Sequence, residues 1–292
     1  METQALTAFL AVVESGSFSE AAHRLHLTQP AVSKRIRSLE NQLNARLFDR
    51  VGREVILTEA GRALIPSAER IVQEIREASQ IVGNLSESVA GRLSMAISHH
   101  ISLYRLPETL KRFIANHSDV ELDLHFLESE RAYQGVINRD LELAFVTLPS
   151  FLDKSLSMEP VWQDPLCFVV GKDHMLAGKT SVRLNELCYI NALLPEKETF
   201  TYQIVKALFE RHKLPLRTSL PINFLETIKV MVSVGLGWSV LPETMLDDSL
   251  TKLNVENVSL SRKLGFIKHR NRTLSNAAQA FLDEMKMDLP EK

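Results

Sequence analysis

Residues 17–40 read SFSEAAHRLHLTQPAVSKRIRSLE, and this stretch decides how the N-terminal part of the chain folds. It carries four Lys or Arg side chains, yet no acidic residue lies between Glu20 and Glu40. The whole chain of 292 residues has 34 Lys and Arg against 36 Asp and Glu, a formal net charge of −2. Any affinity for a polyanion must therefore come from a local basic patch.

Capping and spacing signals predict three short helices around this stretch. The first is predicted from an apolar stripe at Leu6, Phe9, Leu10 and Val13, and Gly16 ends it. Ser17 and Glu20 have capping-box spacing, which predicts the start of a second helix. Thr28 as N-cap, with Pro30 in the first turn, predicts the start of a third.

The third helix has two faces. Its buried face is predicted to hold Val32, Ile36, Leu39 and Leu43, and its exposed face Gln29, Ser33 and Arg37 with Pro30 and Lys34 beside them. A short helix, a tight turn and such a helix form a helix-turn-helix, whose second helix enters the DNA major groove. Gln reads adenine edges there, and Arg or Lys reads guanine or holds phosphate. The alternative interpretation is an ordinary solvated charged face.

The residues that follow, LENQLNARLFDRVGREVILTEAGRALIPSAERIV at 39–72, complete a longer pattern. Together with the first stretch it resembles the N-terminal domain of LysR-type transcriptional regulators. The matching positions are Ser17-Phe18, Ala21-Ala22, Leu25, Gln29 to Ser33, Leu39-Glu40, Leu43, Leu47-Phe48, Arg50, Arg53, Leu57-Thr58 and Ala60-Gly61. One departure is Asn44, where the family usually has glycine. Asn tolerates the left-handed backbone expected there, so the fold is expected to survive.

The resemblance implies that the third helix reads the groove of a double-stranded operator with interrupted dyad symmetry, while a two-stranded wing contacts the DNA backbone. The wing strands are expected at 48–50 and 55–57. Carried over by position, the implied DNA-binding residues are Thr28, Gln29, Pro30, Ser33, Lys34, Arg35, Arg37, Arg50 and Arg53.

Apolar residues then recur at steps of three or four from Leu57 to Leu85. This near-heptad seam predicts a long helix that pairs with a second copy of the chain. The predicted dimerisation residues are Leu64, Ala68, Ile71, Ile75, Ala78 and Val82. The alternative is packing against the chain's own domains. The resemblance also implies a homodimer, a homotetramer built as a dimer of dimers, and RNA polymerase as a further partner.

From Gly91 onward, short strands alternate with helices, a pattern that predicts parallel βαβ units. This part resembles the LysR effector domain, which has the fold of periplasmic solute-binding proteins. The expected fold is thus a multidomain α/β protein with a winged helix-turn-helix at 1–58, a dimerisation helix and hinge at 59–90, and an effector domain at 91–292. Its subdomain I is expected at 91–161 and 267–292, and its subdomain II at 162–266.

Ligands in such folds bind beyond the carboxyl ends of the strands, where helix N-termini offer free N–H groups. The first subdomain supplies Ser98, His99, His100, Glu128, Ser129 and Thr147 there, and Thr199, Thr201, Tyr202 and Trp238 are expected to close the cleft from the second. A Ser and two His at a helix N-terminus suit a carboxylate or phosphate. The alternatives are that His99 and His100 merely cap the helix or face solvent, and that Trp238 belongs to the core.

The sequence contains no GxSxG, HExxH, P-loop or GxGxxG motif, so no enzyme, cofactor or metal site is expected. Cys167 and Cys188 fit no zinc or CxxC spacing, and no apolar run is long enough for a membrane span. A cytoplasmic, sequence-specific regulator controlled by a small, anionic effector is expected. The alternatives are a ligand sensor with weakly specific, architectural DNA binding and an enzyme with a DNA-binding appendage.

Overall fold

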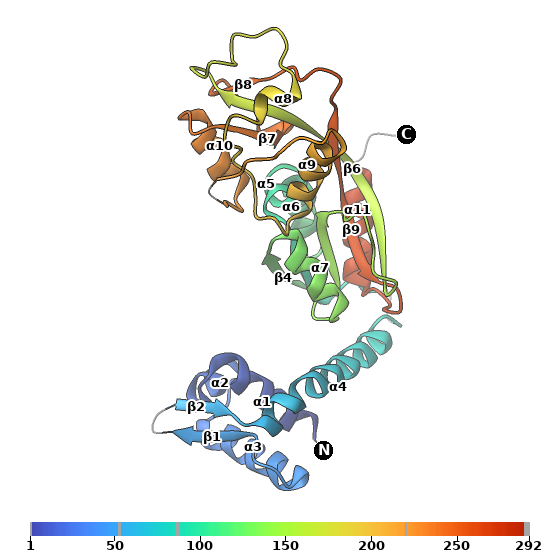
Figure 1. The fold of residues 1–292 in the computed structure, drawn as a ribbon. Coiled ribbons are helices and arrows are strands. Elements are labelled where there is room, and N and C mark those ends of the chain that lie inside the picture. Colours follow the sequence, from blue (N-terminus) through green and yellow to red (C-terminus); the bar gives the residue numbers. More distant parts are fainter. Residues whose placement is uncertain (1, 52–53, 86–87, 220, 289–292) are drawn as a thin grey trace. The chain divides into compact units, whose positions relative to one another are not determined.

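The computed structural model describes residues 2–51, 54–85, 88–219 and 221–288. The chain forms two compact units, Met1–Ser86 and Glu87–Lys292 (Figure 1). Residues 86 and 87, within the predicted hinge, lie outside the described residues. None of the described helices combines the length and apolarity needed to cross a membrane.

The N-terminal unit consists of α1 (Thr3–Ser15), α2 (Phe18–Arg24), α3 (Gln29–Leu43), the antiparallel strands β1 (Phe48–Val51) and β2 (Glu54–Leu57), and α4 (Glu59–Gly83). The predicted caps are confirmed. Gly16 ends α1 with a left-handed φ of 63°, and the hydroxyls of Ser17 and Thr28 accept the backbone N–H groups of Glu20 and Ala31. Local capping chemistry therefore determines where these helices start and stop.

The core of this unit is built from the facing sides of α1, α2 and α3. Val32, Ile36 and Leu39 are buried there as predicted, but Leu43 is 39% exposed. Leu43 is the last residue of α3, and Asn44 follows it with the expected left-handed backbone, φ 49°. The chain turns away at this point, so the predicted burial of Leu43 is wrong.

The apolar seam of α4 is divided between two environments. Ala68 is fully buried, Leu64 packs against the same core cluster, and α1 is the helix that α4 contacts. The prediction that Ala68 pairs with a second copy is therefore wrong, and Leu64 also serves the unit's own core. Farther along, Ile75 is 42% and Val82 67% exposed, and Ile71 is also exposed.

The first half of the effector unit is a three-layered α/β arrangement. Its elements are β3 (Gly91–Ile97), α5 (His99–Tyr104), α6 (Pro107–Asn116), β4 (Val120–Phe126), α7 (Ser129–Ile137) and β5 (Leu143–Thr147). The strands β4, β3 and β5 are parallel, as predicted. Two helices connect β3 to β4, because Pro107 starts a new helix after α5 ends at Tyr104.

The second half is antiparallel, contrary to the expected parallel units. It comprises β6 (Leu156–Gly171), α8 (Leu184–Leu187), α9 (Phe200–Arg211), α10 (Leu225–Ser233), β7 (Trp238–Pro242), η1 (Glu243–Met245), β8 (Leu250–Lys252) and β9 (Leu260–His269). The last helix, α11 (Asn276–Met287), packs back against β3 and α6 of the first half. The strand β6 pairs antiparallel with β7, β8 and β9.

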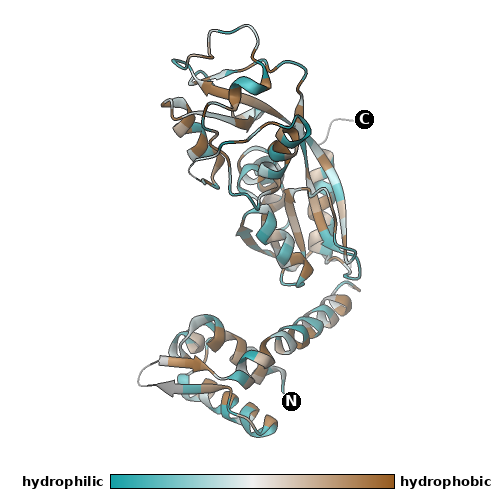
Figure 2. Cartoon of the chain, viewed as in Figure 1, coloured by the Kyte–Doolittle hydropathy of each residue, from teal (hydrophilic) through white to brown (hydrophobic). Residues whose placement is uncertain are grey.

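One sheet of order β4-β3-β5-β9-β6-β7 runs through both halves. Alternate residues of its strands enter separate cores on its two faces, so Phe145 packs with α11 while Val146 packs with α7. Figure 2 shows the hydrophobic residues concentrated on the central strands. The subdomain boundaries expected at 161/162 and 266/267 fall inside β6 and β9, which both halves share.

A buried charge cluster joins β6 to β9. Asp164 is fully buried and lies directly across the ladder from Arg262, whose Nε donates to Oδ2 at 2.8 Å. Arg105, after α5, donates from Nη2 to Oδ1 at 3.0 Å. Arg262 also donates from Nη1 to the Thr201 hydroxyl on α9 at 2.8 Å. Elements distant in the sequence therefore depend on one carboxylate.

The Ala68→Asp substitution is expected to lower the free energy of unfolding of the N-terminal unit by about 3 kcal/mol or more, because it buries an unpaired charge. Ala63→Asp, at an exposed position of the same helix outside the apolar seam, is the matched control and should leave this unit folded. Both Trp residues, Trp162 and Trp238, lie in the effector unit. For Ala68→Asp alone, the melting temperature of the N-terminal unit by circular dichroism is expected to fall. The melting temperature of the effector unit by Trp fluorescence is expected to stay unchanged. Equal stability of the two variants would contradict the assignment of Ala68 to the core.

The Asp164→Asn substitution is expected to cost the effector unit about 3–5 kcal/mol, because two guanidinium groups lose their buried counter-charge. Urea unfolding followed by Trp fluorescence measures this loss. Glu210→Gln, which removes an exposed i,i+4 pair with Lys206, is the control and should cost less than about 0.5 kcal/mol. Similar losses of unfolding free energy in both variants would contradict the stabilising role of the Asp164 cluster.

Candidate functional site

A polar ridge runs along the exposed face of α3. Gln29, Pro30, Lys34 and Arg37 are exposed and Ser33 is half-buried. The Gln29 side-chain amide donates to the Ser33 hydroxyl at 3.1 Å. Within the described part of the chain, Lys34 and Arg37 have no ion-pair partner. The ridge thus presents two uncompensated cations and a hydrogen-bonding amide, the groups that contact phosphates and base edges.

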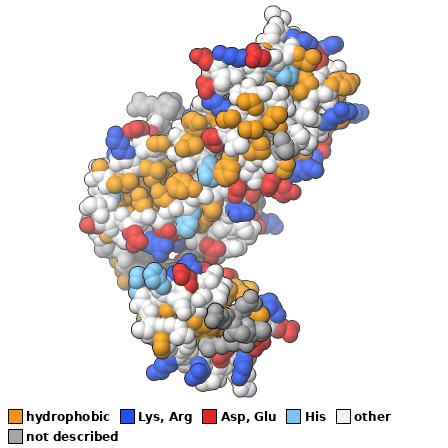
Figure 3. All heavy atoms as spheres, turned by 90° about the vertical axis from the view of Figure 1, so that its left-hand side faces the viewer, with side chains coloured by type: hydrophobic (Ala, Val, Ile, Leu, Met, Phe, Trp, Pro, Cys, Tyr) orange, Lys and Arg blue, Asp and Glu red, His pale blue; other side chains and the backbone are white. Residues whose placement is uncertain are grey.

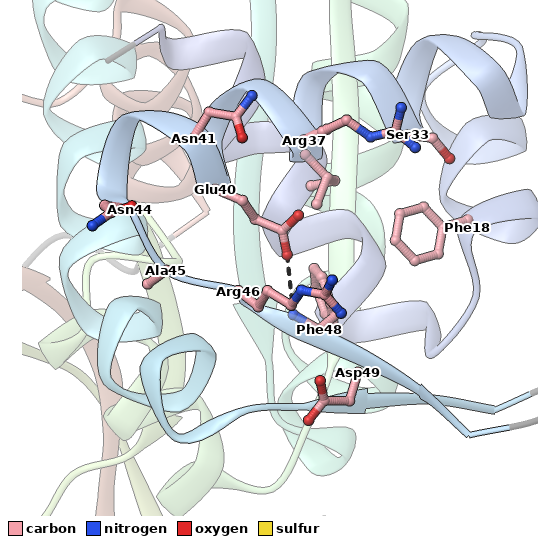
Figure 4. Close-up of a pocket in the computed structure, with 11 residues that line it drawn as sticks. Phe18, Ser33, Arg37, Glu40, Asn41, Asn44, Ala45, Arg46, Phe48 and Asp49 are labelled. Atoms are coloured by element: carbon pink, nitrogen blue, oxygen red, sulfur yellow. Dashed lines mark hydrogen bonds between the residues drawn. The ribbon is translucent and has the colours of Figure 1, made fainter.

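A groove separates this ridge from the wing, and Figure 4 shows Arg37, Glu40 and Asn41 along α3 above Arg46 and Asp49. Glu40 explains why an acid can follow the basic stretch. Its Oε1 accepts the backbone N–H of Leu47 at 2.8 Å and that of Phe48 at 3.4 Å. The carboxylate therefore fastens the start of β1 to α3 and sets the spacing between the ridge and the wing.

The other predicted DNA contacts differ in their placement. Thr28 is exposed and caps α3, and Arg35 donates to the Gln4 side chain on α1 at 2.9 Å, away from the ridge. A contact between Arg35 and a DNA phosphate at the side of the ridge stays a prediction. The wing strands form as predicted. Arg53 and the side chain of Arg50 lie outside the described residues.

A small pocket of about 70 Å³ lies in the effector unit. The structure brings eight of the ten predicted effector residues to its wall: Ser98, His99, His100, Glu128, Ser129, Thr147, Thr199 and Thr201. Ser98 and Glu128 precede α5 and α7, which follow β3 and β4, and Thr147 ends β5. Because these strands are parallel, their carboxyl ends meet at this edge of the sheet.

Two of the ten predicted effector residues lie elsewhere. Trp238 is fully buried, its indole N–H donates to the carbonyls of Leu187 and Ile190, and its ring stacks on Phe209 at 5.7 Å. Tyr202 is buried in the same core cluster. The prediction that they close the cleft is wrong for both, because β7 and α9 direct these side chains toward each other between the layers.

Several pocket residues were not predicted, namely Glu130, Pro195, Asn223, Leu225, Glu226 and Arg262. Arg262 was missed because β9 itself was not predicted. Glu130 stands next to the predicted Ser129 in the first turn of α7, so its position at a strand end was a usable signal. Glu226 likewise stands in the first turn of its helix, α10.

Buried polar atoms of this pocket lack hydrogen-bond partners in the described structure. They are both ring nitrogens of His100, Nη2 of Arg262 and Oε1 of Glu226. His100 and Arg262 are each only 5% exposed. Buried polar groups in proteins are nearly always hydrogen-bonded, so these atoms stay available to a ligand or to solvent. Two of the three side chains offer donors, which suit an anion.

Other polar groups of the pocket are already engaged. The Ser129 hydroxyl accepts the Thr147 backbone N–H at 3.0 Å. The Thr199 hydroxyl accepts the Tyr202 backbone N–H at 3.2 Å and so caps α9. The Ser98 hydroxyl, by contrast, makes no capping bond to α5. Ser98 therefore has its hydroxyl available to a ligand.

The charges around the pocket shift one another's pKa values. Burial would raise the pKa of Asp164, but its contact with His100 and the charge of Arg262 outweigh burial and hold that pKa well below its ordinary value. Burial lowers the pKa of His100, which Asp164, 3.6 Å from its Nε2, only partly offsets. Burial thus favours the neutral imidazole, which has one ring N–H to donate. The described residues contain no cluster of His, Cys, Asp and Glu able to hold a metal ion.

Known proteins match both units. Residues 3–62 match the model of the bacterial regulatory helix-turn-helix protein, lysR family, and residues 86–290 match the LysR substrate binding domain. A RuBisCO operon transcriptional regulator from Allochromatium vinosum is 30% identical over 281 residues, covering 94% of this chain and 92% of that protein.

Two solved structures show the same architecture. A full-length OxyR variant from Pseudomonas aeruginosa, which carries a single cysteine substitution, superposes with a TM-score of 0.72 at 21% identity, covering 98% of this chain and 95% of that one. The Synechocystis PCC6803 CcmR regulatory domain in complex with 2-PG gives a TM-score of 0.63 at 27% identity, covering 69% of this chain and 98% of that one. With a DNA-reading unit and an effector unit that both match, the chain belongs to the LysR family of ligand-controlled, DNA-binding transcriptional regulators.

Proposed function

We propose that this regulator reads a dyad-symmetric operator through the α3 ridge and answers to a small anionic effector bound in the pocket of the effector unit. The observation that carries the proposal is that Nη2 of Arg262 and Nδ1 of His100 are buried without a hydrogen-bond partner among the described residues. These two side chains line one pocket from both halves of the unit. A buried donor without a partner costs free energy that an anionic ligand would recover.

The acidic residues of the pocket narrow the chemistry of the effector. Glu226 lines the pocket with an unpartnered, buried Oε1, which can only accept a hydrogen bond when ionised. An effector that offers anionic oxygens to Arg262 and an O–H to Glu226 would satisfy both. Small hydroxy acids and singly protonated phosphate esters have this combination. The 2-PG complex of the CcmR regulatory domain is consistent with a small ligand in this fold.

The exposed part of α4 supports self-association. Ile71, Ile75, Ala78 and Val82 follow heptad spacing on the solvent side of the helix. Figure 3 also shows apolar side chains gathered on one face of the effector unit. A homodimer would present two α3 ridges to the two halves of a dyad-symmetric operator. Assembly into a tetramer and a contact with RNA polymerase stay predictions.

Replacing Arg37 by Ala is expected to reduce discrimination between an operator fragment from the protein's own promoter and a scrambled fragment by about 1–3 kcal/mol, the value of a base-edge contact. Fluorescence anisotropy at one fixed salt concentration measures both affinities. Arg24→Ala is the control, because Arg24 is already paired with Glu14 at 3.1 Å. If the wild type binds both fragments equally, DNA binding is architectural and the proposed sequence reading fails.

Replacing Ser98 by Ala is expected to weaken the binding of a small anion by about 1 kcal/mol, since one hydrogen bond is lost without a folding defect. Thermal-shift titration with a panel of hydroxy acids and phosphate esters, 2-PG included, measures this change. Ser102→Ala is the control, because its hydroxyl donates to the His99 carbonyl instead of lining the pocket. Identical titrations for both variants would place the ligand elsewhere.

A further inference from the structure

We propose that Glu130 is a tethered anion that occupies part of the effector site, and that an anionic effector binds by displacing it. Glu130 would then couple ligand binding to the contact between the two halves of the effector unit. This inference rests on the proposed function, because it presumes that the pocket receives an anion.

The first observation is a hydrogen bond that crosses between the halves. Glu130 belongs to α7, and its Oε1 accepts the backbone N–H of Phe200 at 2.6 Å. Phe200 is the first residue of the 12-residue helix α9. The helix α7 packs with β5 in the first half, whereas α9 packs in the core around Trp238 in the second. The rings of Tyr133 and Phe200 meet edge-on beside this bond, 6.2 Å apart.

The N-terminus of α9 is where an anion is electrostatically favoured, because the first N–H groups of a helix point outward with a partial positive charge. Thr199 satisfies the N–H of Tyr202, and Glu130 satisfies that of Phe200. The position that would suit the anionic group of a ligand is thus already held by a carboxylate of the chain.

The second observation is Arg262, which lines the same pocket and donates to Thr201 one residue farther along α9. Its Nη2 is buried and has no partner in the described structure. Together with Arg105 it faces the single carboxylate of Asp164, so this cluster holds two positive charges against one negative charge. Glu128, Glu130 and Glu226 also line the pocket, and the Glu130 carboxylate lies close enough to Arg262 to interact with its charge while it bonds the first N–H of α9.

The Glu130 carboxylate satisfies the positive groups around it only in part. Burial raises its pKa, and the hydrogen bond from Phe200 lowers it less than burial raises it. Its hydrogen bond reaches Phe200 but leaves Nη2 of Arg262 unsatisfied. A free phosphate or carboxylate could bond both groups at once. Two anions cannot share such a space without repulsion, so Glu130 must leave, and its departure breaks the bond between α7 and α9.

The test compares the wild-type full chain with Glu130→Gln and Glu210→Gln by calorimetric titration with inorganic phosphate. Gln keeps an oxygen that accepts the Phe200 N–H but removes the competing charge. Glu210→Gln is the matched control, because Glu210 is exposed near the far end of α9, outside the pocket, and pairs with Lys206. Glu130→Gln is expected to bind phosphate about tenfold more tightly or better, and Glu210→Gln less than about twofold more tightly, because the charge of Glu210 is screened by solvent.

Phosphate binding that strengthens equally in both variants, or in neither, overturns the role of Glu130 while the proposed effector site stands. Failure of all three proteins to bind phosphate overturns the anion site itself, together with this inference. Hydrogen exchange of the Phe200 amide in the ligand-free proteins gives an independent measurement. Exchange is expected to be at least about tenfold faster in Glu130→Ala than in the wild type, and an unchanged rate would contradict the bond between the halves.

Discussion

The antiparallel pairing of β6 with β9 is the constraint on which the effector unit depends. These strands carry one sheet through both halves, and Asp164 faces Arg262 across their ladder. A buried carboxylate with two guanidinium partners is costly to form, and it stays buried only because each partner satisfies part of it. Nη2 of Arg262 lacks a hydrogen-bond partner among the described residues, and so it stays available to another anion. The chemistry of the pocket therefore follows from how the two halves are joined.

In the N-terminal unit, too, polar contacts determine which charged side chains stay available. On the α3 ridge, Lys34 and Arg37 have no ion-pair partner among the described residues, while a Glu40 carboxylate oxygen accepts backbone N–H groups at the start of the wing. The two cations therefore remain available for the proposed contact with DNA. In α4, the residues near α1 complete the unit's own core, and only those farther along remain for a partner. One periodic seam thus completes the core with its first part, and its exposed part is the surface proposed for self-association.

The features predictable from sequence were those set by local chemistry. Capping at Ser17 and Thr28 and the left-handed Asn44 were correct because each depends on a few neighbouring residues. Strands β6 and β9 were largely missed, since polar residues such as Asp164 interrupt their apolar pattern and find partners only across the sheet. Trp238 was misplaced for a related reason, because which face of β7 packs against α9 is decided by tertiary contacts. The pocket residues at the ends of the parallel strands were predicted correctly. Residues that reach the pocket from other elements, such as Arg262 on β9, were not predicted.

Ligand binding in the pocket and DNA binding by the α3 ridge are proposed to be coupled within this regulator. The operator affinity of the full chain across a titration with an anion that binds the effector unit measures this coupling directly. Saturation with the anion is expected to change the operator dissociation constant, and operator DNA is expected to change the anion's dissociation constant by the same factor, as linkage requires. An anion that binds the pocket while operator affinity stays constant would contradict this coupling.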